Sequence, residues 1–209
     1  MVTLREWPDE IHLIGAGGIG THVLLALIEL GAKTIHVWDD DLVERHNRPS
    51  QFVYTPDDVG SPKVQGMQRF VERQGYSTTV IPHQVRVDAT TSLNGIVVSG
   101  VDSMASRKEI WKAILGSRGF VPVYIDGRIE DEHVHLMNVD PLDPIQVKQY
   151  EKTLFDDGSA PALSCTTNEN PHSPLRVAEK VSMNLTLFLR GEPVKLAVYS
   201  NLRLEALNR

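Results

Sequence analysis

Short apolar segments alternate with longer amphipathic segments along much of the chain. Apolar, β-favouring composition predicts strands at residues 11–14, 34–38, 78–82, 95–99, 121–126, 133–139 and 195–202. Apolar residues at helical spacing, such as Val64, Met67, Phe70 and Val71, predict helices at residues 21–30, 63–74, 106–115 and 175–189. Because strands and helices alternate, we expect an α/β fold whose first strands are parallel and joined by right-handed crossovers.

Two long polar segments interrupt this alternation. Residues 43–62 are turn-rich and long for a connection in a compact α/β domain, so we expect an active-site loop there. Residues 141–174 are rich in Pro, Asp, Asn and Ser and are predicted to form a loop-rich crossover. At roughly 150 residues per domain, the length predicts one Rossmann-like three-layer domain over residues 1–209. We expect its sheet to be mostly parallel, with an antiparallel C-terminal extension.

Composition narrows the class of protein. The 41% of hydrophobic residues suffice for an ordinary globular core. Lys and Arg number 21 against 27 Asp and Glu, a net charge of −6 that argues against duplex nucleic-acid binding. The single cysteine, Cys165, excludes an internal disulfide and a zinc site built on Cys pairs. No apolar run reaches the roughly 18 residues of a membrane span. We therefore expect a cytoplasmic protein that binds neither membranes nor nucleic acid.

A glycine cluster follows the first predicted strand and opens the first predicted helix. Its members are Gly15, Gly17, Gly18 and Gly20. Glycines at such positions permit a tight turn, let backbone amides approach a phosphate and allow close packing of helix on strand. Asp39 lies 39 − 20 = 19 positions after the last glycine, at the end of the second predicted strand, where an acid can hold ribose hydroxyls. These residues predict a nucleotide site and leave open whether the nucleotide is NAD(P) or ATP.

Three further motifs follow the glycine cluster in order. They are D-D-D-L-V-E with Asn47 and Gln51 in residues 39–51, D-D-V-G-S-P-K in residues 57–63, and G-V-D-S with Arg107 in residues 100–107. In this order and spacing the motifs resemble those of the ThiF/MoeB family of ubiquitin-activating-type adenylyltransferases, from about residue 11 to residue 192. A hydride-transferring Rossmann enzyme has no chemical reason to carry the first two of them.

The resemblance implies that the glycine turn binds ATP and that Mg²⁺ is a cofactor. It places Asp39 on the ribose, Lys63 on the phosphates and Asp102 as the ligand of Mg²⁺. Further nucleotide-binding residues that the motifs imply are Asp41, Asn47 and Gln51. A lysine and a divalent cation suit this chemistry, because a carboxylate that attacks an α-phosphate brings two anions together.

The resemblance also implies a reaction and a partner. The expected reaction adenylates the C-terminal carboxylate of a ubiquitin-like or sulfur-carrier protein with a Gly-ended tail and releases pyrophosphate, and the expected assembly is a homodimer. Cys165 resembles in position the acyl-accepting cysteine of some family members, so its thiolate is a candidate nucleophile that would form a thioester. The alternative for a lone intracellular cysteine is a small buried hydrophobe.

The chain departs from the family pattern at the arginine before Gln51. Ser50 occupies that position, and Arg48 is the nearest candidate to neutralise the β- and γ-phosphates. Arg5 is a weak substitute for a residue that an N-terminal helix lends to the partner subunit in some members. Two alternatives to an adenylyltransferase therefore stay open at this point, an NAD(P)-dependent Rossmann oxidoreductase and a non-catalytic nucleotide-binding scaffold of the same fold.

Overall fold

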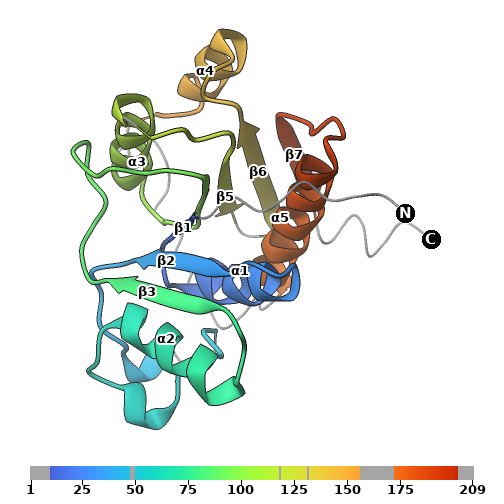
Figure 1. Ribbon diagram of the computed structural model, residues 1–209. Coiled ribbons are helices and arrows are strands. Elements are labelled where there is room, and N and C mark those ends of the chain that lie inside the picture. Colours follow the sequence, from blue (N-terminus) through green and yellow to red (C-terminus); the bar gives the residue numbers. More distant parts are fainter. Residues whose placement is uncertain (1–9, 48–49, 118, 131, 156–171, 202–209) are drawn as a thin grey trace.

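The computed structural model describes residues 10–47, 50–117, 119–130, 132–155 and 172–201. Within these ranges seven strands form one sheet in the order β3-β2-β1-β4-β5-β6-β7 (Figure 1). The strands are β1 (Ile11–Ile14), β2 (Thr34–Trp38), β3 (Thr79–His83), β4 (Ile96–Ser99), β5 (Tyr124–Glu130), β6 (His133–Val139) and β7 (Ala197–Asn201). Strands β1 to β5 run parallel, whereas β6 and β7 pair antiparallel. The predicted Rossmann-like sheet with an antiparallel C-terminal extension is confirmed.

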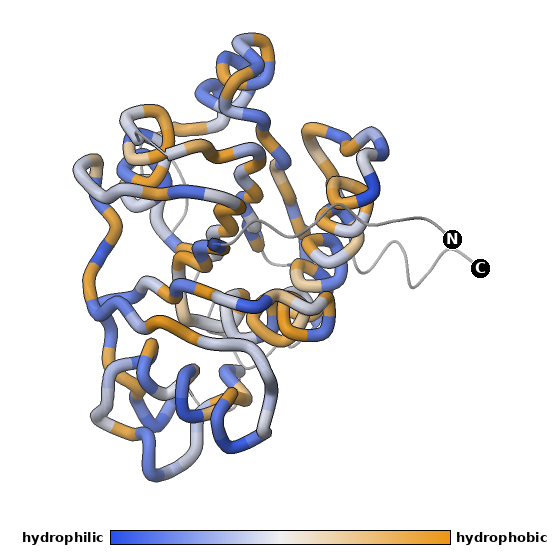
Figure 2. Tube along the Cα trace, in the orientation of Figure 1, coloured by the Kyte–Doolittle hydropathy of each residue, from blue (hydrophilic) through white to orange (hydrophobic). Residues whose placement is uncertain are grey.

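Helices cover both faces of the sheet and make it the middle of three layers (Figure 1). They are α1 (Gly18–Glu29), α2 (Lys63–Gln74), α3 (Met104–Gly116), α4 (Pro144–Glu151) and α5 (His172–Arg190). Hydrophobic and hydrophilic residues are interleaved along α2 and α5 (Figure 2), so each helix can present an apolar side to the sheet. Every helix within the described ranges is too short or too polar to be a membrane span.

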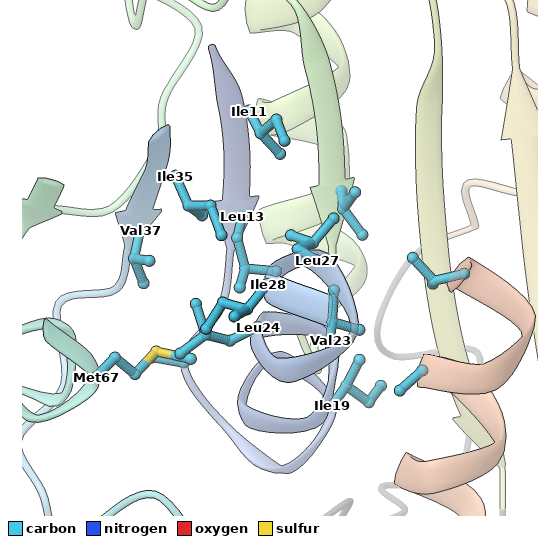
Figure 3. Close-up of a cluster of buried hydrophobic side chains, with 14 of the residues drawn as sticks. Ile11, Leu13, Ile19, Val23, Leu24, Leu27, Ile28, Ile35, Val37 and Met67 are labelled. Atoms are coloured by element: carbon cyan, nitrogen blue, oxygen red, sulfur yellow. The ribbon is translucent and has the colours of Figure 1, made fainter. Parts of the chain in front are cut away.

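Two apolar cores lie on opposite faces of the sheet. The larger one joins β1 and β2 to α1, α2 and α5. Side chains from β1, β2 and α1 converge in it, and Met67 reaches in from α2 (Figure 3). Leu13, Leu24 and Leu27 are completely buried there, which fixes α1 against the strands by apolar burial. The smaller core packs α3 and α4 on the other face.

The segment predicted as a loop-rich crossover, residues 141–174, contains helix α4, which the sequence pattern did not predict. The Asp143 carboxylate accepts hydrogen bonds from the amides of Ile145 and Gln146, and Pro144 starts the helix. This is ordinary N-terminal capping with proline in the first turn. Other differences are shifts of element ends: α3 and α5 begin before their predicted starts, and β5 runs on past residue 126 to Glu130.

The glycine turn lets α1 start directly on the carboxyl end of β1. Gly15 has a φ of 100°, a backbone conformation that favours glycine. A Cβ atom at Gly20 would lie 1.9 Å from the carbonyl oxygen of Gly15. The backbone of the first helical turn therefore touches the backbone of the strand end with no side chain between them, which confirms the close packing that the glycines predict.

This contact predicts a difference between two substitutions of glycine. Gly20→Ala forces backbone atoms apart, so we expect it to lower the free energy of unfolding by about 2 kcal/mol or more. Gly17→Ala is the matched control, because a Cβ there meets no atom within 4 Å; its effect should stay below about 1 kcal/mol. Urea denaturation measures both, and equal losses in the two variants would contradict the proposed packing.

Candidate functional site

A cleft of about 360 Å³ opens at the carboxyl ends of β1, β2 and β4. The chain leaves β1 toward β2 on one side and later returns to form β4 on the other, and ligands of open α/β sheets bind at such a switch point. Of the residues that the sequence singles out, those that line the cleft are Gly15, Gly17, Gly18, Asp39, Asp41, Gln51, Lys63 and Asp102. The structure thus brings most of the predicted site residues together.

The remaining predicted site residues do not line the cleft or cannot be located. Gly20 lies behind the glycine turn, in its packing role. Asn47 ends the 3-10 helix Arg45–Asn47, and its side chain lies outside the described part of the structure. Arg48 and Cys165 also lie outside the described residues. Their predicted roles therefore stay predictions.

The start of α1 lines the cleft with half-buried Gly17 and Gly18, whose backbone amides are hydrogen-bond donors. Its N-cap, Gly17, offers no side-chain hydrogen bond to the first turn, so the amides there are available to a ligand. The space where a Gly17 side chain would lie is empty, with no atom within 4 Å. Together with the positive end of the helix dipole, these amides suit a phosphate group.

Asp39 is held rigidly at the end of β2. One carboxylate oxygen accepts a hydrogen bond from the amide of Ala16 at 2.7 Å, and the other accepts from the amide of Asp41 at 2.8 Å. Burial raises the pKa of Asp39 above its ordinary value, and the charge of Lys63 acts against this rise. Because a carboxylate can accept about four hydrogen bonds, Asp39 keeps acceptor capacity for ribose hydroxyls.

Lys63 is a buried cation in an electrostatically unfavourable place. It is the first residue of α2, where the helix dipole disfavours positive charge, and its side chain is only 8% exposed. Its ammonium lies 2.6 Å from a carboxylate oxygen of Asp41, whose side chain is 60% exposed. Burying an ammonium costs free energy unless it is paired. Since Asp41 is exposed and can be solvated by water instead, Lys63 can turn from Asp41 to an anion in the cleft.

Gln51 carries a polar atom with no partner. The residue is 1% exposed and lines the cleft, and its side-chain oxygen has no hydrogen bond within the described structure. A buried acceptor without a donor is uncommon in native proteins. A ligand that donates a hydrogen bond in the cleft would satisfy it, which agrees with the predicted place of Gln51 in the nucleotide site.

The carboxylates at the cleft differ in the hydrogen bonds and ion pairs that they make within the protein. Oxygens of Asp39, Asp40 and Asp41 lie within 4.8 Å of one another, but this acidic triplet already accepts bonds from backbone amides, Lys63 and Arg86. Asp102 follows β4, is exposed and lines the cleft. The N-cap of α3 is Ser103, not Asp102. One carboxylate beside a phosphate site fits Mg²⁺, which commonly uses one or two carboxylates plus phosphates.

Several residues that line the cleft were not predicted from the sequence. Trp38, Val87, Val101 and Ile110 give the cleft an apolar wall. Arg86 lies at its rim with a guanidinium nitrogen 3.2 Å from Asp40, and the hydrogen bond to this carboxylate raises the pKa of Arg86. Arg86 follows β3, so a signal existed: the carboxyl ends of parallel strands meet at one edge of the sheet.

The fold and the cleft define a Rossmann-like α/β protein with an anion-binding helix start. The chain belongs to the ThiF family, whose family model matches residues 4–120. It is 34% identical over 108 residues to the SAMP-activating enzyme E1 of Haloferax volcanii, covering 49% of this chain and 40% of that protein. It is 31% identical over 102 residues to the adenylyltransferase and sulfurtransferase MOCS3 of Caenorhabditis briggsae, covering 46% and 25%. The aligned part is thus less than half of each relative's length.

Solved structures share the fold at low sequence identity. A crystal structure of PaaA superposes with a TM-score of 0.70 at 16% identity, covering 93% of this chain and 61% of that one. A crystal structure of E. coli MccB with ATP superposes with a TM-score of 0.67 at 19% identity, covering 91% and 60%. At such low identity these similarities concern the fold alone, and no residue role is transferred from them.

The buried cation leads to a prediction for the pKa of Asp39. Lys63→Met removes the charge that opposes the burial effect, so the pKa of Asp39 should rise further. The stability that this carboxyl contributes is greatest below its unfolded pKa of about 3.8 and is lost as the pH rises to the folded pKa. That loss should therefore extend to higher pH in the variant. An NMR titration of the carboxyl carbon measures this shift, with exposed Lys33→Met as control. An unchanged pKa would show that Lys63 does not act on Asp39.

Proposed function

We propose that this protein binds ATP in the cleft and transfers AMP to a carboxylate. The observation that carries the proposal is Lys63, a buried ammonium that shares the cleft with the uncapped start of α1. Two sources of positive charge in one cleft suit a triphosphate and the charge that develops during transfer. Membership of the ThiF family and the adenylyltransferase among its relatives support the same activity.

The chemistry needs charge and orientation rather than a base. A carboxylate is ionised at neutral pH, and one of its oxygens bonds to the α-phosphorus while the bond to the oxygen bridging the α- and β-phosphates breaks. Pyrophosphate leaves with that electron pair, and no proton is transferred. Lys63 offsets the repulsion between the two anions, while Asp39 orients the ribose. Mg²⁺ bound by Asp102 and the phosphates would supply further positive charge.

We propose that the substrate is the C-terminal carboxylate of a ubiquitin-like or sulfur-carrier protein with a Gly-ended tail. The relatives support this class, since one is a SAMP-activating enzyme and another a Nedd8-activating enzyme catalytic subunit from Drosophila melanogaster, 30% identical over 105 residues. A crystal structure of E. coli MccB contains MccA and an ATP analogue. We further propose a cytoplasmic homodimer, as the resemblance to the family implies.

Two other functions are distinguished by experiment. An NAD(P)-dependent oxidoreductase is disfavoured by membership of the ThiF family, and calorimetric titrations with ATP and with NAD⁺ separate it from an ATP-dependent enzyme. A non-catalytic scaffold is favoured by one observation, Ser50 at the family's arginine position. Tight ATP binding without ATP–pyrophosphate exchange for any carrier protein would support the scaffold and contradict the proposed activity.

The proposed role of Asp102 predicts the effect of its removal. Asp102→Ala should lower carrier-dependent, Mg²⁺-dependent ATP–pyrophosphate exchange on the order of 100-fold, the size expected for one electrostatic contact in a transition state. The melting temperature should stay close to that of the wild type, because Asp102 is exposed. Glu72→Ala, which removes an exposed carboxylate outside the cleft, is the control. Full exchange activity in the Asp102 variant would mean that the metal is held elsewhere.

We propose that Cys165 accepts the acyl group from the adenylate, as its position in the family resemblance implies. Its thiolate would bond to the carbonyl carbon and AMP would leave, giving a thioester. Cys165→Ala should then spare ATP–pyrophosphate exchange but abolish a thiol-sensitive covalent adduct with the carrier, detected by mass spectrometry. The same adduct in the alanine variant would rule out this acceptor.

A further inference from the structure

A fully buried carboxylate lies beneath the cleft. Asp126 of β5 is 0% exposed and pairs in register with Ser99 of β4. One of its oxygens lies 3.2 Å from Nε of Arg107 and accepts from the Ser99 hydroxyl at 3.2 Å. The other oxygen lies 2.7 Å from Nη2 of Arg128 and accepts from the Tyr150 hydroxyl at 3.0 Å. Asp126 therefore joins β4, β5, α3 and α4.

This cluster holds more cations than the carboxylate needs. Burial by itself would raise the pKa of Asp126, but the charges of Arg107 and Arg128, together with hydrogen bonds from Arg128 and Tyr150, lower that pKa below its ordinary value. Both guanidiniums are buried, with side chains 5% and 11% exposed. One arginine would suffice to pair the carboxylate, and a second buried cation is costly unless it makes further bonds. The further bonds of each arginine therefore indicate what it does.

The two arginines reach in different directions from the same carboxylate. Nη2 of Arg107 donates a hydrogen bond to the carbonyl oxygen of Val101, the residue before Asp102. Arg128 instead donates to the carbonyl and the hydroxyl of Thr153, just beyond α4, at 3.2 and 3.0 Å. Arg107 therefore contacts the backbone at the cleft, whereas Arg128 contacts the chain that follows α4.

The contact of Arg107 completes the support of the short loop that carries Asp102. On the strand side, the Gly100 amide donates to the carbonyl of Ile14 at 2.9 Å. On the helix side, the Ser103 hydroxyl accepts a hydrogen bond from the amide of Ser106 and caps α3. Between these two points, the guanidinium of Arg107 holds the peptide unit that joins Val101 to Asp102.

We propose that Arg107, oriented by Asp126, is a positioning residue that aims Asp102 at the divalent cation accompanying ATP. Arg107 touches neither nucleotide nor metal and acts by holding the backbone before Asp102. The inference rests on the proposed function, because it assumes that ATP and Mg²⁺ bind in this cleft. Groups that orient a metal ligand commonly change metal affinity 10- to 100-fold when they are altered.

The chain provides a matched pair of substitutions on the two sides of Asp126. Arg107→Lys keeps the charge but loses the forked contact that reaches both Asp126 and Val101, whereas Arg128→Lys loses the contact with Thr153 and leaves that of Arg107 intact. Arg107→Met is a second variant, and we expect it to fold because Asp126 and Arg128 remain as a balanced pair. Isothermal titration of full-length protein with ATP, with and without Mg²⁺, gives the Mg²⁺-dependent gain in affinity for each.

We expect the factor by which Mg²⁺ increases ATP affinity to be about tenfold smaller in both Arg107 variants than in the wild type, while their ATP affinity without Mg²⁺ stays within about twofold of the wild type. Arg128→Lys should match the wild type in both titrations. If the Arg107 variants keep the full Mg²⁺-dependent gain in ATP affinity, the positioning role is wrong. The same holds if Arg128→Lys loses as much of this gain as they do. Neither result would contradict ATP binding. A wild type that binds ATP without any gain from Mg²⁺ would overturn the positioning role as well. A wild type that binds no ATP would overturn the proposed function itself.

Discussion

The contact between the Gly15 carbonyl and the backbone at Gly20 fixes where α1 begins, and with it the helix start on which the rest of the cleft converges. At that point α1 starts on the end of β1 with no side chain between them, so its first turn lines the same cleft as the ends of β2 and β4. Asp39 then binds the amide of Ala16, within the same turn. The larger apolar core holds α1 in this position from behind. The cleft is therefore a consequence of how the first strand and helix pack.

The cleft contains polar and charged groups that a bound ligand can pair with. Lys63 is buried but paired with the exposed Asp41, and Gln51 has an acceptor without a donor. Beneath the cleft, Asp126 is surrounded by two arginines, one of which holds the carbonyl before Asp102. A buried cation in a poor electrostatic position and an unpartnered acceptor both cost stability. Binding of a nucleotide that offers phosphates to Lys63 and a hydrogen-bond donor to Gln51 would offset both costs.

Features encoded by neighbouring residues could be predicted from the sequence, and features that depend on distant residues could not. The parallel strands, the glycine turn and the places of Asp39 and Lys63 follow from local spacing and from the motifs. Helix α4 was missed although Asp143 and Pro144 form a local start signal, because the polar composition around it indicated a loop. The bond from Arg107 to Asp126 spans 19 residues and two elements, so no spacing rule reveals it. Arg48 and Cys165 lie outside the described residues, so their roles stay predictions.

The proposed function requires this cleft to hold a triphosphate between a helix start and a buried lysine. The decisive experiment is a crystal structure with Mg²⁺ and a non-hydrolysable ATP analogue. We expect the ribose hydroxyls to contact Asp39, phosphate oxygens to accept from the amides at Gly17 and Gly18, and the Lys63 ammonium to turn from Asp41 to a phosphate. A nucleotide bound elsewhere, or a Lys63 still paired with Asp41 and out of reach of every phosphate, would contradict the proposed function.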